Sequence, residues 1–308
     1  MGLSSIQHIE PGQLLEFEAD LFITALDLES RCTTIARKFE KKSCRKIALV
    51  QTDQLKEFSY DENNAYFTDQ GFEIISVESK VPDFGVLFSM FQEDTIRVIL
   101  DCTCMSPRWY HEFFNWFDEN QDEYSEVSLR MVYTMAGFKD HERILKVKSV
   151  KSFLKKEYEG TQKKKSALIL GLGYEKEVSK EIYNKIKPDI LYLFYADPPV
   201  DKKFVEKVFV NNHAMINSIP IRNLITYPIR NGQIIYQTLI DTILPLRNEY
   251  TIIVVPHGPK IFAAVSMLVH LGYPDIQVSY PKFKKSPAIN EIPCDEPVVL
   301  DILFEGEE

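Results

Sequence analysis

The sequence predicts an α/β protein built from two tandem halves, each a mainly parallel five-stranded sheet flanked by helices. The main observation is an internal repeat. Five short apolar runs, typical of strands, occur twice in the same order, and each run in the second half follows its counterpart by 143 to 154 residues. Helix-like stretches lie between the runs. Continuously apolar strands that alternate with helices indicate a parallel sheet covered on both faces, and a repeat of the whole series predicts two copies of one fold.

The apolar runs define the ten predicted strands. They cover residues 21–26, 47–50, 73–77, 98–100 and 127–133 in the first half, and 167–171, 190–194, 224–229, 252–255 and 276–280 in the second. Three helices are predicted between them, at residues 108–117, 175–186 and 260–271. The middle one carries a single apolar stripe on a charged helix, and the other two are apolar around most of their circumference. This alternation is the organisation of a Rossmann-like domain.

The predicted domain boundaries place an N-terminal half at residues 1–145 and a C-terminal half at residues 166–308. Residues 146–165 are rich in lysine and predict a basic connector, either a solvated linker or a docking patch for an acidic partner or nucleic acid. Residues 1–20 are expected to form a leader against the first sheet. Residues 297–304 predict a final apolar strand at a sheet edge, followed by an acidic tail.

Composition limits the class of protein and its compartment. The net charge of −9 weighs against broad, non-specific binding of nucleic acid, although a local basic pocket remains compatible with it. No apolar run approaches the ~20 residues of a membrane span, and the N-terminal residues lack a signal-peptide pattern. A cytoplasmic protein without membrane contact is therefore expected. The five cysteines are scattered, and no second pair joins Cys102 and Cys104, so neither a disulfide framework nor a metal site is predicted.

The end of the predicted strand 252–255 is the strongest candidate site, because ligands bind at the carboxyl ends of parallel strands. His257, Gly258, Pro259 and Lys260 follow this strand at the expected start of a helix. Gly258 allows close approach of a ligand to the backbone, and Pro259 suits a first helical turn. Lys260 is unfavourable at a helix N-terminus unless an anion offsets its charge. These residues predict an anion site, and the alternative is an ordinary turn with a solvent-facing lysine.

The corresponding strand end in the first half has a similar layout. Thr103, Ser106 and Arg108 follow the predicted strand 98–100, with a proline between the last two. The planar guanidinium of Arg108 suits a phosphate or carboxylate ligand. Ser106 taken alone would cap the helix. Because a basic residue recurs at the same point of both halves, we predict that these residues also contact the ligand.

Two glutamates recur after the first strand of each half. Glu29 and Glu175 are expected to open the next helix, where a carboxylate either stabilises the helix start or bonds to a ribose or base. Gly173 lies beside Glu175 and joins the predicted ligand-binding residues. A dinucleotide-binding motif would need a third glycine where Lys176 stands, so neither NAD nor another cofactor is predicted.

No set of catalytic residues emerges from the sequence. His257 is the one histidine on the predicted ligand face, and its pKa range suits a general base, but nothing in the sequence orients it. His270 lies late in an apolar helix and is expected to be a core histidine with satisfied hydrogen bonds. The sequence contains no P-loop, nucleophile elbow or His-Glu-x-x-His motif.

The segment His257-Gly258-Pro259-Lys260-Ile-Phe-Ala-Ala resembles the fourth-strand signature of the CARF-like superfamily, in which a strand leads through Gly-x-Lys into a helix. Two such halves in one chain are similar to the SAVED arrangement, and the resemblance covers about residues 20–281. Pro259 stands where the family usually has a small hydroxyl residue. These families sense cyclic or linear oligonucleotide messengers in prokaryotic antiviral systems. The resemblance implies ligand contacts from His257, Gly258, Lys260, Thr103, Ser106, Arg108, Glu29 and Glu175.

The resemblance implies a non-catalytic nucleotide-sensing or adaptor component of a prokaryotic antiviral defence system. Such sensors usually carry a fused effector, and because the two halves use nearly the whole chain, a separate effector protein is the expected partner besides a nucleotide ligand. One alternative is an enzyme that cleaves or modifies a nucleotide messenger, with His257 and Lys260 in acid–base and phosphate-binding roles. Another is a protein–protein scaffold with a degenerate ligand site, for which the aromatic helix at residues 109–117 could serve as the interface.

Overall fold

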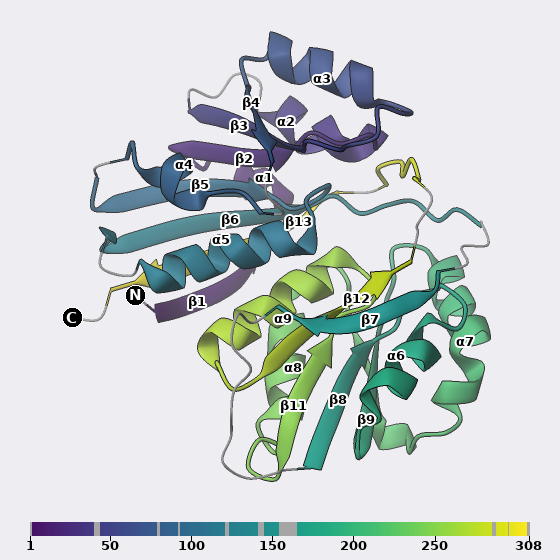
Figure 1. Ribbon diagram of the computed structural model, residues 1–308. Helices are drawn as coiled ribbons and strands as arrows, with labels where there is room; N and C mark the ends of the chain where they lie inside the picture. Colours follow the sequence, from purple (N-terminus) through teal and green to yellow (C-terminus); the bar gives the residue numbers. More distant parts are fainter. Residues whose placement is uncertain are drawn as a thin grey trace. The chain divides into compact units, whose positions relative to one another are not determined.

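The computed structural model describes residues 2–39, 44–78, 81–91, 93–120, 123–140, 145–153, 165–284, 288–294 and 296–306. The chain forms two compact units, which we call unit 1 (Met1–Gly137 with Ala288–Glu308) and unit 2 (Phe138–Pro287). Each unit contains one mostly parallel sheet with helices against it (Figure 1). The predicted α/β fold class with two Rossmann-like halves is therefore confirmed.

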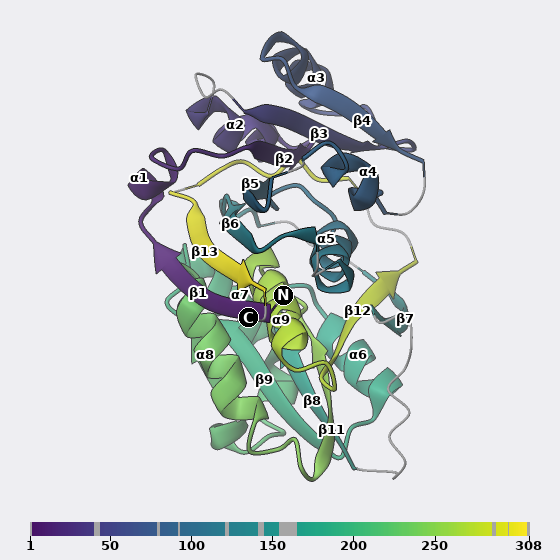
Figure 2. The same ribbon diagram turned by 90° about the vertical axis from the view of Figure 1, so that its left-hand side faces the viewer.

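The sheet of unit 1 has seven strands. They are β1 (Gly2–Ile9), β2 (Leu21–Ala25), β3 (Arg45–Gln51), β4 (Glu73–Val77), β5 (Thr95–Asp101), β6 (Glu126–Tyr133) and β13 (Val298–Glu305). Their spatial order is β1-β13-β6-β5-β2-β3-β4. Strands β2 to β6 are parallel to one another. Beyond β6 the sheet continues with β13, which runs antiparallel to β6, and with β1, which runs antiparallel to β13 (Figure 2). The helices are α1 (Pro11–Leu14), η1 (Ser30–Thr33), α2 (Thr34–Lys38), α3 (Tyr60–Asp69), α4 (Phe84–Phe88) and α5 (Pro107–Glu119).

The sheet of unit 2 has six strands. They are β7 (Val147–Ser152), β8 (Lys165–Gly171), β9 (Ile190–Ala196), β10 (Leu224–Tyr227), β11 (Tyr250–Val255) and β12 (Gln277–Phe283). Their spatial order is β10-β9-β8-β11-β12-β7, and only β7 runs antiparallel. The helices are α6 (Val178–Ile186), α7 (Lys202–Ile216), η3 (Ile221–Asn223), α8 (Gly232–Ile243) and α9 (Lys260–Gly272).

The parallel strands of both units follow one spatial order, 3-2-1-4-5, when they are numbered along the chain within each unit. The direction of winding therefore reverses between β2 and β5 in unit 1 and between β8 and β11 in unit 2. Ligands of open α/β sheets bind at this switch point, outside the carboxyl ends of the strands. The topology thus predicts one ligand-binding region in each unit, at the ends of β2 and β5 in unit 1 and of β8 and β11 in unit 2.

Aromatic side chains fill the core of unit 1 on both faces of the sheet. Phe22 of β2 packs edge-to-face with Phe39 and Phe72 at centroid distances of 5.7 and 5.6 Å. On the other face, Phe117 of α5 stacks on Phe304 of β13 at 6.3 Å. The α5 residues Trp109, Tyr110, Phe113, Phe114 and Phe117 are all buried. These five rings are therefore core residues of unit 1, whereas Trp116 of the same helix is half-buried, and the interface considered for this helix stays a prediction.

Two pairs of helices cover the sheet of unit 2, α6 with α7 on one face and α8 with α9 on the other (Figure 1). Val178 and Ile182 of α6 pack with Leu168 and Leu170 of β8 in the core on the first face. On the second face, Phe262 of α9 stacks on Tyr227 at 4.9 Å. The stripe predicted for α6 and the apolar circumference predicted for α9 both follow from this packing.

The two units differ from the predicted domains at both ends of the chain and in the predicted connector. The first part of the predicted basic connector is β7, because Val147 and Val150 pack on the core of unit 2 while Lys148 and Lys151 are exposed. Residues 154–164 lie outside the described residues. Residues 1–20 contain β1 rather than only a leader, and Ala288–Glu308 belongs to unit 1, where β13 pairs with β6.

No helix among the described residues has both the length and the apolar character needed to cross a membrane.

Candidate functional site

A histidine–glutamate pair lies at the switch point of unit 2. Glu175 follows β8 and His257 follows β11, and the side chains of both are only 10% exposed. The distance from His257 Nε2 to Glu175 Oε2 is 3.3 Å. Within the described part of the chain this Nε2 atom has no partner in hydrogen-bonding geometry. The two side chains therefore lie as close together as an ion pair. Nε2 of His257 nevertheless lacks a well-oriented hydrogen bond in the described structure.

Glycines allow the two loops that carry this pair to pack together. A Cβ atom on Gly173 would lie 2.5 Å from Glu175 Oε2 and 2.7 Å from His257 Nε2. Gly258 adopts a φ of +143°, and its Cβ would lie 2.9 Å from the carbonyl oxygen of Leu172. Such positions exclude an ordinary side chain. In the described structure these glycines serve contact between loops, whereas the sequence analysis had assigned Gly258 to the approach of a ligand.

Helix α7 holds the loop after β8 in place. Asn212, buried in α7, donates through Nδ2 to the carbonyl oxygen of Gly173 at 2.9 Å. Its neighbour Asn211 donates to the carbonyl oxygen of Tyr174 at 2.5 Å. Sequence analysis missed both asparagines. In the sequence they are two adjacent amide residues in an amphipathic helix. That pattern does not indicate that they donate to carbonyl groups almost 40 residues earlier in the chain.

Helix α9 begins directly after His257 and Gly258. Its N-cap residue is Pro259, and Lys260 is its first residue and half-buried. The free N–H groups of this first turn and the positive end of the helix dipole therefore lie at the carboxyl end of β11. The proline stands one position earlier than predicted, because helical geometry starts only at the lysine.

Glu175 occupies a different place from the one predicted. Helix α6 begins at Val178 and has Glu177 as its N-cap residue, in a left-handed conformation with φ of 67°. Glu175 therefore precedes the helix, and its carboxylate faces His257 instead of the helix start. The structure thus supplies an orienting group for His257 that the sequence did not reveal.

The switch point of unit 1 is a buried polar network. Asp101 at the end of β5 is fully buried and accepts hydrogen bonds from Thr24 Oγ1 at 3.3 Å and from the backbone N–H of Thr103 at 3.0 Å. Burial raises the pKa of Asp101 to about 6, although the bonds from both threonines oppose the shift. Thr103 Oγ1 in turn accepts from the backbone N–H of Thr134 at 2.9 Å. The buried Thr103 side chain therefore joins the ends of β5 and β6.

The other first-half residues are also engaged in local contacts. The carboxylate of Glu29 lies 2.5 Å from Nε of Arg31, a buried arginine in η1 that sequence analysis missed. Ser106 caps α5 and accepts from the backbone N–H of Arg108 at 3.4 Å. Arg108 is half-buried at the start of this helix. Capping by Ser106 and burial of Thr103 explain these residues without a ligand.

The predicted core role of His270 agrees with the structure, because its Nδ1 atom lies 2.9 Å from the carbonyl oxygen of Ile276. No group of three or more metal-ligating side chains gathers in a suitable arrangement within the described ranges.

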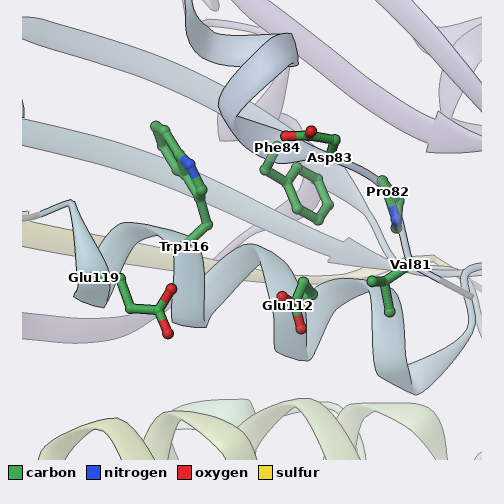
Figure 3. Close-up of a pocket in the computed structure, with 7 residues that line it drawn as sticks. All are labelled: Val81, Pro82, Asp83, Phe84, Glu112, Trp116 and Glu119. Atoms are coloured by element: carbon green, nitrogen blue, oxygen red, sulfur yellow. The ribbon is translucent and has the colours of Figure 1, made fainter. Parts of the chain in front are cut away.

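A separate pocket of about 280 Å³ lies between α4 and α5 of unit 1 (Figure 3). Glu112, Trp116 and Glu119 line it from α5, with the segment from Val81 to Phe84 opposite. None of the predicted ligand-binding residues lines this pocket. The Asp83 carboxylate beside it caps α4 by accepting from the backbone N–H of Val86 at 3.2 Å.

Comparisons with known proteins identify no family. No family model and no curated protein matches the chain. The cytoplasmic domain of a prokaryotic cation chloride cotransporter is 10% identical, with 86% of this chain and 95% of that chain covered and a TM-score of 0.25. An N-terminal ketoreductase from a macrolactin assembly line is also 10% identical, with coverages of 89% and 72% and a TM-score of 0.23. The fold assignment therefore rests on the sheet topology, and these similarities carry no functional argument.

Proposed function

We propose that unit 2 binds a nucleotide at the carboxyl ends of β8 and β11, and that the chain is a non-catalytic nucleotide-sensing or adaptor component. The observation that carries this proposal is the His257–Glu175 pair at the switch point, buried directly ahead of α9. A buried imidazole nitrogen that lacks a hydrogen-bond partner among the described residues invites a ligand atom.

The chemistry of the site suits a phosphorylated ligand. A phosphate at the N-terminus of α9 would accept from free backbone N–H groups and interact favourably with the helix dipole. Lys260 in the first turn would then offset the ligand's charge. His257 would donate to the phosphate through Nε2, and the Glu175 carboxylate would accept from a ribose hydroxyl group.

The wider role in our proposal follows from the resemblance of the His257–Lys260 segment to the CARF-like superfamily. Two tandem Rossmann-like halves support this assignment. On this basis the ligand is a cyclic or linear oligonucleotide messenger, the partner is a separate effector protein, and the setting is prokaryotic antiviral defence.

A thermal-shift screen of the purified chain against cyclic and linear oligonucleotides, NAD and common nucleotides tests the proposal. A ligand at 100 times its Kd stabilises the native state by about 2.7 kcal/mol, which raises the Tm of a chain of this size by at least a few degrees. We expect one oligonucleotide class to give this shift, and Lys260→Ala to abolish it. The control is Lys180→Ala, an exposed lysine on α6 of the same unit. A screen without any hit, or a hit that Lys260→Ala leaves unchanged, contradicts the proposal.

A second candidate function is an enzyme that cleaves a nucleotide messenger. The observation in its favour is the 3.3 Å approach of the Glu175 carboxylate to Nε2 of His257, since a carboxylate beside one imidazole nitrogen leaves the other nitrogen as the general base. Incubation with a labelled oligonucleotide distinguishes the two functions. Turnover that disappears in His257→Gln while binding persists supports the enzyme, and binding without turnover supports the sensor.

A further inference from the structure

A buried arginine lies at the strand ends of unit 1, and the proposed function uses residues of unit 2 only. The side chain of Arg31 is only 4% exposed. Its Nε atom lies 2.5 Å from the Glu29 carboxylate, and Nη1 donates to the carbonyl oxygen of Thr134 at 2.9 Å. Burial of a guanidinium is unfavourable unless its N–H groups are paired. These two contacts pair Nε and Nη1 of the guanidinium, and neither involves Nη2.

The third partner of Arg31 is a carboxylate from a distant part of the sequence. Nη2 lies 3.7 Å from Glu291 Oε2, well beyond the 2.7–2.9 Å that is typical of a charge-assisted hydrogen bond. Glu291 precedes β13, and its segment is attached to η1 by two bonds from Ser30. The Ser30 N–H donates to Asn290 Oδ1 at 2.8 Å, and the Ser30 hydroxyl donates to the Glu291 carbonyl at 3.1 Å. Glu291 is 21% exposed, whereas Arg31 is 4% exposed, so the carboxylate is the more accessible member of this pair.

A buried hydroxyl group beside this contact lacks a partner. Thr134 follows β6, is fully buried, and its carbonyl is the one that accepts from Arg31. Its Oγ1 atom has no hydrogen-bond partner in the described part of the chain. Buried hydroxyl groups are nearly always hydrogen-bonded. The hydroxyl, unpartnered in the described structure, of the residue that binds Arg31 through its carbonyl, and the long contact from Nη2 to Glu291, are the two observations that single out this arginine.

We propose that Arg31 forms a second anion-binding site, in which Glu291 is the resident anion and a phosphate group of a ligand replaces it. The guanidinium keeps a counter-ion throughout, because one anion leaves it as another arrives. A phosphate oxygen can accept from Nη2 while a second accepts from the Thr134 hydroxyl, and arginine is well suited to this geometry. Release of Glu291 loosens the segment before β13. Binding at Arg31 therefore changes the stretch through which the chain returns to unit 1.

Titration of the full chain with inorganic phosphate tests this site. We expect Glu291→Ala to bind phosphate at least roughly tenfold more tightly than the unmodified chain, since the competing carboxylate is gone and a charged donor becomes available. Glu296→Ala is the matched control, because this glutamate lies on the same returning segment but is 64% exposed and pairs with Lys38. Adding Arg31→Lys to Glu291→Ala should abolish the gain. Equal phosphate affinity in the unmodified chain and Glu291→Ala would overturn the proposal.

Hydrogen exchange supplies a test that needs no folded Arg31 variant. Saturating phosphate should speed exchange of the Ser30 N–H in the unmodified chain, because that amide loses its bond to Asn290 when the segment is released. Unchanged exchange at saturation contradicts the proposal. Titration with AMP alongside phosphate shows whether the phosphate belongs to a nucleotide or is free. Phosphate binding that Lys260→Ala weakens belongs to the proposed site in unit 2, whereas the gain in Glu291→Ala and the exchange of the Ser30 N–H report on Arg31 alone. Failure here is therefore distinguishable from failure of the proposed site in unit 2.

Discussion

The strand ends at the switch point carry different polar groups in unit 1 and unit 2, although the two sheets share one topology. In unit 1 the strand before the switch-point helix ends in Asp101, and both threonines beside it satisfy its carboxylate within the core. In unit 2 the matching strand ends in apolar Val255, and polar chemistry begins two residues later with His257 and its Glu175 neighbour. One strand end is thus a structural network, whereas the other presents an imidazole with a nitrogen lacking a partner in the described structure.

This contrast teaches that a duplicated fold does not imply duplicated sites. The parallel sheet brings polar residues to the same edge in both halves, because its strands all end there. What those residues do depends on their neighbours. Thr103 forms hydrogen bonds with Thr134 and Asp101, whereas Gly173 and Gly258 allow the loops around His257 to pack closely together.

The largest expected effect concerns the buried cation of unit 1. Arg31→Met removes the partner of Glu29 and of the Thr134 carbonyl, and breaking such a buried pair lowers the free energy of unfolding by about 3–5 kcal/mol. The control is Arg97→Met, since Arg97 is 44% exposed and exposed pairs contribute only about 0–1 kcal/mol. Urea denaturation measures both. Similar losses in the two variants would mean that the unit 1 network is not the buried structural element described here.

The second effect is the pH dependence that Asp101 imposes. Its pKa is raised to about 6 from 3.8, so the folded chain holds a proton that the unfolded chain releases. The free energy of unfolding therefore falls as pH rises from about 4 to about 6, by roughly 3 kcal/mol in total, and stays lowered above that window. Asp101→Asn should remove this slope. The half-buried cap residue Asp201 is the control, and Asp201→Asn should retain it. An unchanged slope in Asp101→Asn contradicts the assignment.

The third effect tests loop packing in unit 2. Gly258→Ala combines a φ of +143° with a Cβ 2.9 Å from a carbonyl oxygen, and we expect it to lower the free energy of unfolding by about 1–3 kcal/mol. It should also weaken any ligand of the His257 site. Gly12→Ala is the control, because a Cβ there meets nothing within 4 Å. Thermal unfolding that ranks the two variants equally would show that the loops are not packed as described.

The smallest effect compares helix caps in the two units. Ser106→Ala removes a 3.4 Å cap bond of α5, and Asp201→Ala removes a 2.9 Å cap bond of α7. We expect losses of about 0.5 and about 1 kcal/mol in the free energy of unfolding, in that order. Neither variant should change nucleotide binding. A loss of ligand affinity in Ser106→Ala would restore this residue to the binding role that the sequence suggested.

The repeated pattern allowed the parallel strands and the principal helices to be predicted, because continuous apolar runs are buried on both faces of such sheets. The predicted strand at residues 73–77 coincides with β4, and the predicted helices at 108–117 and 260–271 fall within α5 and α9. The antiparallel strands β1 and β7 were missed. Both lie at a sheet edge with few buried residues, and lysines in β7 suggested a solvated segment.

The candidate sites were less predictable, because they depend on contacts between residues far apart in the sequence. His257 was identified by its position after a strand, but Glu175 became its partner only through the pairing of β8 with β11. Arg31 gave no signal, since a lone arginine in a short segment is usually exposed. Its burial follows from Glu29, Thr134 and Glu291, and the last of these lies 260 positions further along the chain.

Hydrogen exchange with and without an oligonucleotide from the thermal-shift screen tests the central claim most directly. The claim is that the strand ends of unit 2 bind the nucleotide. It predicts slower exchange of backbone amides in residues 171–178 and 256–262, and loss of that protection in Lys260→Ala. Protection confined to residues 101–108 of unit 1, or protection in unit 2 that survives Lys260→Ala, would contradict it.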